Sequence, residues 1–144
     1  MASLKKSVVI GASVEDVFAY VSEPAAMPEW HPNLVEVRDV IGTGAGQQYN
    51  WTFKYVGVLL HGQTTVVEYV PNEFVVHQSI GKIESTWTLS VEPHGKDAKF
   101  TIEVEYTIPV PVPVLGKLAE HLIVKRDART LEMALTNVQE TLER

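Results

Sequence analysis

The stretch AKFTIEVEYT at residues 98–107 decides the fold. Its apolar and polar side chains alternate strictly, and this period of two predicts a β-strand with one dry and one wet face. The dry face is expected to carry Phe100, Ile102, Val104 and Tyr106. Residues 114–142 follow with apolar side chains at helical spacing and no proline. They predict one long C-terminal helix of about 40 Å, at about 1.5 Å per residue.

The segment IPVPVP at residues 108–113 joins this strand to the helix. Because proline lacks an amide donor and favours extended backbone, the segment cannot join a sheet ladder and is predicted to be a stiff connector. The apolar stripe of the helix drifts around residues 125–127. This drift indicates either a bend or an N-terminal half that faces a different environment.

Upstream of residue 107 the same period of two recurs, interrupted by glycine and proline at intervals typical of an antiparallel meander. The alternation of side chains predicts the inner faces of two further strands. It does not decide to which face His61, His77 and Glu68 point. Seven strands are predicted in all, at residues 4–10, 34–41, 47–55, 60–70, 73–80, 83–92 and 98–107. The two inner faces carry Tyr49, Trp51, Phe53 and Tyr55, and Ile83, Ser85, Trp87, Leu89 and Val91.

Two short helices are predicted between the first and second strands. Ser13 is an expected N-cap, and the helix after it presents Val17, Phe18 and Val21 to the interior. Prolines at 24 and 32 confine the second helix to a short segment that carries Trp30. An indole in such a segment either plugs the rim of the core or acts as a movable gate.

Composition excludes several classes of protein. The 144 residues, 45% hydrophobic and 21% charged, suit a single globular domain spanning 1–144. A net charge of −6 repels polyphosphate, so no nucleic-acid partner is expected. The chain has no cysteine, which removes disulfides and thiolate ligands. No segment is typical of a secretory signal or a membrane span, so we expect a cytoplasmic protein without stable membrane insertion.

The sequence predicts no metal site and no cofactor. The five histidines lack the spacing of a zinc motif, and the glycine-rich residues 42–46 indicate a hairpin rather than a phosphate-binding turn. Parity places Glu84, Glu103 and Glu105 on the wet face, which argues against a buried carboxylate pair. The apolar residues 58–60 indicate an ordinary hairpin tip, a gate lip or a membrane-touching edge.

The order of these elements resembles the polyketide cyclase/dehydrase and lipid-transport group of the START-like (Bet v 1-like) superfamily, also named SRPBCC. The resemblance covers nearly the whole chain. It implies an α+β helix-grip fold: a seven-stranded curved antiparallel sheet, two short helices and one long C-terminal helix over an internal cavity. The residues that carry it are VIGASVEDVF at 9–18, MPEWHP at 27–32, GAG at 44–46, VEYVP at 67–71, Trp87, YTIP at 106–109 and GKL at 116–118.

A cavity of this kind makes some aromatic and helix side chains candidates for ligand contact, although core packing explains any one aromatic ring equally well. His121, His77 and Tyr106 are also candidates for acid–base catalysis, and a purely structural role is the alternative for His121. The predicted ligand contacts are Trp30, Trp51, Phe53, Trp87, Tyr106, Leu118, His121 and Leu122.

Three functional hypotheses follow. The leading one is binding of a hydrophobic or amphipathic small molecule of lipid, polyketide or aromatic type in the cavity, by a monomer or homodimer. The alternative is a polyketide cyclase/dehydrase-type enzyme that uses the same cavity. The third is an interaction or chaperone-like domain that binds a protein segment in the groove.

Overall fold

The computed structural model describes residues 2–107 and 116–144, with the side chains of the last helix described from Glu120 onward. The predicted connector at 108–113 lies outside the described residues. The elements in chain order are β1 (Ala2–Ile10), α1 (Val14–Val21), the 3-10 helix η1 (Pro24–Ala26), α2 (Met27–Trp30), β2 (Leu34–Ile41), β3 (Gln48–Tyr55), β4 (Val58–Val70), β5 (Phe74–Gly81), β6 (Ser85–His94), β7 (Asp97–Tyr106) and α3 (Gly116–Leu142).

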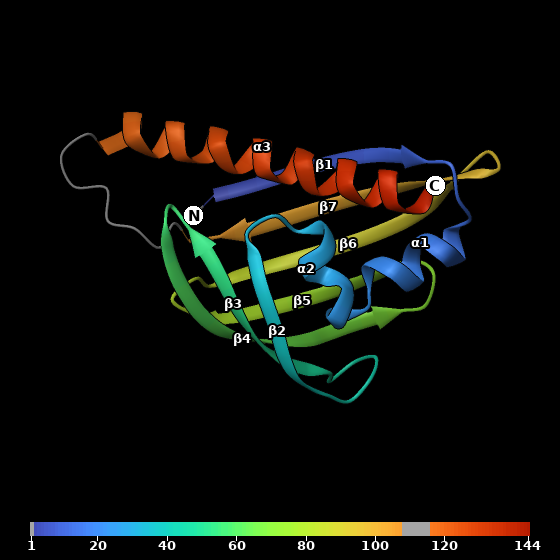
Figure 1. Ribbon diagram of the computed structural model, residues 1–144, viewed down its shortest axis with the longest axis horizontal. Helices are drawn as coiled ribbons and strands as arrows, with labels where there is room; N and C mark the ends of the chain where they lie inside the picture. The colour runs from blue at the N-terminus through green and yellow to red at the C-terminus, as the bar shows by residue number, and fades with distance from the viewer. Residues whose placement is uncertain (1, 108–115) are drawn as a thin grey trace.

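The strands form one antiparallel sheet of seven, in the order β1-β7-β6-β5-β4-β3-β2. The first strand of the chain therefore pairs with the last, and the sheet curves so that β2 and β3 cross in front of the inner strands (Figure 1). The helix α3 runs along β1, and α1 and α2 lie on the same side of the sheet (Figure 1). This arrangement confirms the predicted α+β helix-grip fold.

Strand boundaries agree with the predicted ones to within two residues. The largest differences, of two residues, are at the starts of β1 and β4, which begin at Ala2 and Val58 rather than Leu4 and Leu60, and at both ends of β6. A two-residue turn explains the early start of β4, since Val56 and Gly57 take positive φ angles of 50° and 80° and pair Tyr55 with Val58. Positive φ at both central positions matches the twist of a tight hairpin.

The sheet register determines to which face of the sheet His61, His77 and Glu68 point, which the sequence left open. His61 is exposed and His77 is buried, so the two histidines of neighbouring strands β4 and β5 point to opposite faces. A register shift between Val66 and Glu68 inserts an extra residue in β4 and inverts the parity there. Glu68 is consequently exposed.

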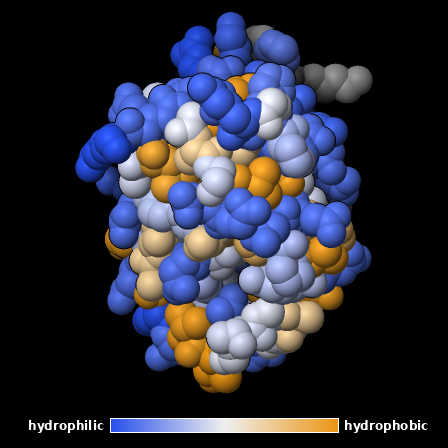
Figure 2. Space-filling view, turned by 90° about the vertical axis from the view of Figure 1, so that its right-hand side faces the viewer, coloured by the Kyte–Doolittle hydropathy of each residue, from blue (hydrophilic) through white to orange (hydrophobic). Residues whose placement is uncertain are grey.

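The end of the sheet under α1 and the C-terminal half of α3 is solidly packed. Ser13 caps α1 by accepting a hydrogen bond from the backbone N–H of Asp16, and Val17, Phe18 and Val21 are buried as predicted. Figure 2 views the molecule from this end, and its surface mixes hydrophilic and hydrophobic side chains. A hydrophobic group lies at the lower edge, where Figure 1 places the β2–β3 connection and where Val40 and Ile41 are exposed.

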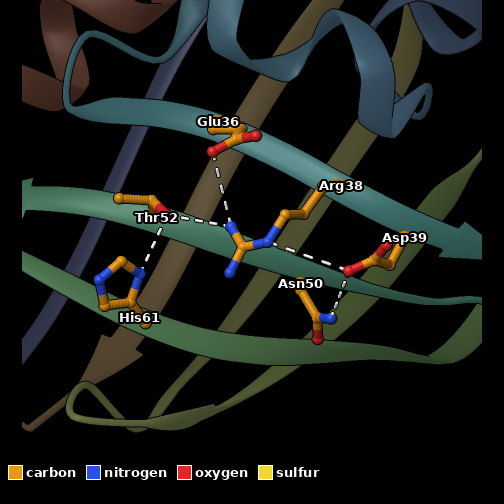
Figure 3. Close-up of polar contacts among 6 residues, drawn as sticks. All are labelled: Glu36, Arg38, Asp39, Asn50, Thr52 and His61. Atoms are coloured by element: carbon orange, nitrogen blue, oxygen red, sulfur yellow. Dashed lines mark hydrogen bonds and ion pairs between the residues drawn. The ribbon is translucent and has the colours of Figure 1, made fainter.

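The outer face of β2, β3 and β4 carries a polar network. Arg38 donates to the Thr52 hydroxyl at 3.1 Å and forms ion pairs with Glu36 and Asp39, while Thr52 also contacts Nδ1 of the exposed His61 (Figure 3). These contacts bury Thr52 on the face opposite Trp51 and Phe53. The network therefore stabilises the outer strands and lies away from the interior.

Candidate functional site

A cavity of about 120 Å³ lies between the inner face of the sheet, α2 and the middle of α3. Its walls are mostly apolar, with Leu131 on the helix side and Leu89 and Val104 on the sheet side. Seven aromatic side chains also line it: Trp30, Tyr49, Trp51, Phe53, Tyr55, Trp87 and Tyr106. Rigid rings leave space between a curved sheet and a straight helix, because they cannot adapt to it as aliphatic chains do.

His31 is the side chain that α2 directs into the cavity wall. Pro28 and Pro32 keep α2 short, and the His31 amide donates to the Met27 carbonyl at 2.9 Å, which ends the helix. Its ring packs edge-on against Phe53 and Trp87, at centroid distances of 5.3 and 5.2 Å. Burial lowers the pKa of His31 to about 4, so the ring is neutral at physiological pH.

A row of hydroxyl-bearing residues crosses the cavity floor, because directly paired residues of five neighbouring strands share the inner face. Thr64 and Ser79 share a hydrogen bond of 2.6 Å, and Trp87 donates its indole N–H to Ser85 at 3.0 Å. Each member is buried or nearly so. The row runs Tyr106, Ser85, Ser79, Thr64, Tyr49 across β7, β6, β5, β4 and β3.

His77 lies beside this row on β5. Its Nδ1 contacts the Tyr49 hydroxyl at 3.1 Å, and burial lowers the pKa of His77 to about 4. Its Nε2 is one of five buried ring nitrogens without a hydrogen-bond partner among the described residues. The others are Nε1 of Trp30, both nitrogens of His31 and Nε1 of Trp51. All four residues line the cavity.

Asp127 of α3 brings a carboxyl group to the opposite side of the cavity. The Tyr55 hydroxyl donates to its Oδ2 at 2.8 Å, and the Tyr106 hydroxyl donates to the same oxygen. Burial raises the pKa of Asp127, while the two tyrosine hydrogen bonds lower it. Burial, and then the bond to Asp127, raise the pKa of both tyrosines. These bonds tie α3 to β3 and β7.

The sequence missed Asp127 and Tyr55 as site residues. The available signal was the drift of the apolar stripe at 125–127, since Asp127 lies four residues before Leu131 and so on the same helix face. A charged side chain on the apolar face of a helix is a candidate functional residue, because charged side chains are rarely buried. Thr130 lines the cavity from the same face.

Of the predicted contact residues, the structure brings Trp30, Trp51, Phe53, Trp87 and Tyr106 together around the cavity, and His77 with them. It does not bring His121 and Leu122 there: both are exposed, Leu122 by 58%. Leu122 precedes Leu131 by nine residues, which places it about 180° around the helix. The expectation that this part of the helix turns His121 and Leu122 inward is therefore wrong. The Leu118 side chain lies outside the described residues.

Other predicted features are placed away from the cavity or carry no site. The glycines of 42–46 have positive φ angles and form the β2–β3 connection. At the β3–β4 tip, Val58 and Leu59 are 51% and 56% exposed. Within the described ranges, no group of three or more potential metal ligands comes together. No helix of the described chain is long and apolar enough to cross a membrane.

Comparison with solved structures supports the fold. The chain is similar to the protein TTHA0849 from Thermus thermophilus, with 17% identity, a TM-score of 0.83 and coverage of 98% of this chain and 97% of that one. It is similar to a START superfamily protein from Mycobacterium smegmatis, with 23% identity, a TM-score of 0.71 and coverage of 97% and 98%. For the Zhui aromatase/cyclase from Streptomyces sp. R1128 the values are 12%, 0.77, 99% and 94%.

No curated protein matches the chain. Residues 1–143 match the protein family described as polyketide cyclase / dehydrase and lipid transport. This match spans all three helices and all seven strands, and it agrees with the resemblance carried by the opening strand and capped helix. The chain therefore belongs to the polyketide cyclase / dehydrase and lipid transport family.

Proposed function

We propose that the protein binds a small hydrophobic molecule with polar substituents in the cavity between the sheet and α3. One observation carries the proposal: four residues that line the cavity carry five buried ring nitrogens that lack partners among the described residues. An unsatisfied buried polar group costs about 1–3 kcal/mol. A ligand that supplies hydrogen-bond partners to these nitrogens recovers this energy. A core without space for a ligand would leave the nitrogens unpaired.

The cavity volume limits the size of the ligand. An apolar cavity of about 150 Å³ accommodates benzene, so about 120 Å³ suits a single ring or a short branched chain. Burying about 200 Å² of such a ligand gains about 5 kcal/mol before the costs of ordering. We therefore expect dissociation constants of about a millimolar from apolar burial alone, and tighter ones where the ligand also supplies hydrogen-bond partners. Larger lipids or polyketides require the helices to move apart.

Catalysis on a bound ligand, of the cyclase/dehydrase type, is the second candidate. The Tyr106–Asp127 contact at the cavity wall favours it, since a carboxyl group whose pKa is raised can exchange a proton with a ligand. His77 supports it less, because a pKa of about 4 makes the imidazole a weak base. Turnover of a synthetic polyketide that Asp127→Asn abolishes would establish this activity in place of binding alone.

Ligand-induced stabilisation tests the binding proposal. A panel of single-ring compounds is expected to raise the melting temperature saturably, and calorimetry should give one site. Thr130→Trp fills the cavity from α3 and should abolish the shift. Thr136→Trp places the same ring on an exposed part of the same helix and should leave the shift intact. A panel without a single stabilising compound, or stabilisation that survives Thr130→Trp, contradicts the proposal.

A further inference from the structure

The carboxylate of Asp127 lies at the cavity wall without an ion-pair partner among the described residues. Burial raises its pKa, and the charge of the adjacent Arg126, which does not line the cavity, lowers it in part. The ion pairs among the described residues lie on the surface, and none includes Asp127. The described lining residues include no lysine or arginine, and Asp127 is their one charged side chain. Buried charges in proteins are normally paired, because leaving water is costly. Among the described residues, the cavity lining therefore supplies no positive charge to Asp127.

The hydrogen bonds at Asp127 leave room for a donor from the ligand. Tyr55 and Tyr106 both donate to Oδ2, so an ionised Asp127 can accept a further hydrogen bond at Oδ1. Oδ1 has no partner among the described residues. A ligand group that reaches Asp127 must therefore donate a hydrogen bond, and a positively charged donor gains most.

Aromatic faces next to Asp127 suit a cation as well. Tyr55 is stacked on Phe53, with ring centroids 6.2 Å apart and planes inclined by 28°. Phe53 in turn meets Trp51 edge-on at 6.4 Å. Such faces attract a cationic nitrogen through the negative potential of the ring. The net charge of −6 favours the approach of a cation and disfavours that of a carboxylate.

We propose that the ligand is a hydrophobic amine, with its ring between the aromatic walls and its protonated nitrogen bound to Oδ1 of Asp127. This inference rests on the proposed function and adds the chemical class of the ligand. It separates an amine from two other single-ring classes that the cavity could accept on size alone, neutral alcohols and carboxylic acids. A carboxylate would meet Asp127 with like charge.

A matched set of benzylamine, benzyl alcohol and benzoate tests the charge preference by calorimetry at pH 7.5. We expect benzylamine to bind at least tenfold more tightly than benzyl alcohol, and benzoate to bind most weakly. Asp127→Asn keeps an acceptor for the two tyrosines and removes the charge. It should bring benzylamine to the affinity of benzyl alcohol. Glu140→Gln removes one exposed charge from the same helix and should preserve the preference.

The outcomes separate this inference from the function on which it rests. If benzyl alcohol binds as tightly as benzylamine, the amine class is wrong and the binding function stands. If none of the three compounds binds, the binding function fails with it. A preference for benzylamine that persists in Asp127→Asn reflects the overall charge of the protein and overturns the assignment to Asp127. Asp127→Ser provides the same test if the asparagine variant does not fold.

Discussion

The two ends of the sheet's inner face are built differently. Under α1 and the C-terminal half of α3, the side chains of Ile10, Phe100 and Val138 are fully buried and fill the space. Under α2 and the middle of α3, Phe53 and Trp87 are half-buried around a cavity. The same sheet and the same helix thus give a solid core at one end and a hollow at the other. The difference lies in the side chains, because mostly aliphatic groups fill the solid end, whereas seven aromatic rings and several polar groups line the hollow end.

Truncating one phenylalanine at each end is the strongest way to break this comparison. Phe100→Ala opens a new cavity in a packed core and should lower the free energy of unfolding by about 3–5 kcal/mol. Phe53→Ala enlarges a space that already exists, and we expect a loss of about 1–2 kcal/mol. Urea denaturation with a common m-value measures both. Equal losses would show that the hollow end is packed as tightly as the solid one.

Acid sensitivity is expected to come from the hollow end, where His31 and His77 are buried and uncharged. The pKa of each is lowered from 6.5 to about 4 in the folded state. The folded state therefore binds fewer protons than the unfolded chain, so its stability is complete above about pH 6.5 and is lost as the pH falls towards 4. Between pH 8 and pH 5 each histidine should cost about 2 kcal/mol.

Denaturation series at pH 8 and pH 5 measure this loss. His31→Phe keeps a ring between Phe53 and Trp87 and should remove about half of the pH dependence. The exposed His94 offers a matched control, and His94→Gln should leave the dependence unchanged. An undiminished pH dependence in His31→Phe would mean that groups other than His31 drive the acid transition.

The difference between the packed end and the cavity end also explains how well each end could be predicted from the sequence. The solid end was predictable, because AKFTIEVEYT and the helix after Ser13 show one dry face at the period of their element. The hollow end was predictable where it lies on strands, as for Trp51 and Phe53, and at Trp30 of α2. On α3 the prediction failed, since the stripe includes the polar Asp127 and Thr130, and apolarity alone pointed to Leu122 on the far side.

The packing of Trp51 provides a third test of the hollow end. Its ring lies over Gly62 of β4, where an added Cβ would come within 2.1 Å of the indole and 2.5 Å of the Ile80 carbonyl oxygen. Gly62→Ala should push the indole into the cavity and cost about 2 kcal/mol. In Gly11→Ala the Cβ meets the Glu143 side chain at ordinary contact distance, and a change below about 0.5 kcal/mol is expected.

Urea denaturation compares the two alanine variants, and ligand stabilisation of Gly62→Ala shows whether the cavity has shrunk. We expect the melting shift by single-ring compounds to fall in Gly62→Ala and to persist in Gly11→Ala. If both variants are equally stable and bind equally, the indole can move without cost, and the wall at Trp51 is softer than the contacts indicate.

The smallest expected effect concerns Asp127 itself. Because burial raises its pKa, the folded state holds this proton more tightly than the unfolded chain does, and the ionised group reduces stability at neutral pH. The group is only partly buried, so solvent screening keeps the penalty small. Asp127→Asn retains an acceptor for Tyr55 and Tyr106 and should leave the free energy of unfolding at pH 7 unchanged or higher by up to about 1 kcal/mol.

A loss above about 2 kcal/mol in Asp127→Asn would instead make Asp127 a structural tie between α3 and the sheet. Near-neutral stability combined with lost amine binding would show that the hollow end keeps a charge for its ligand that the solid end would exclude.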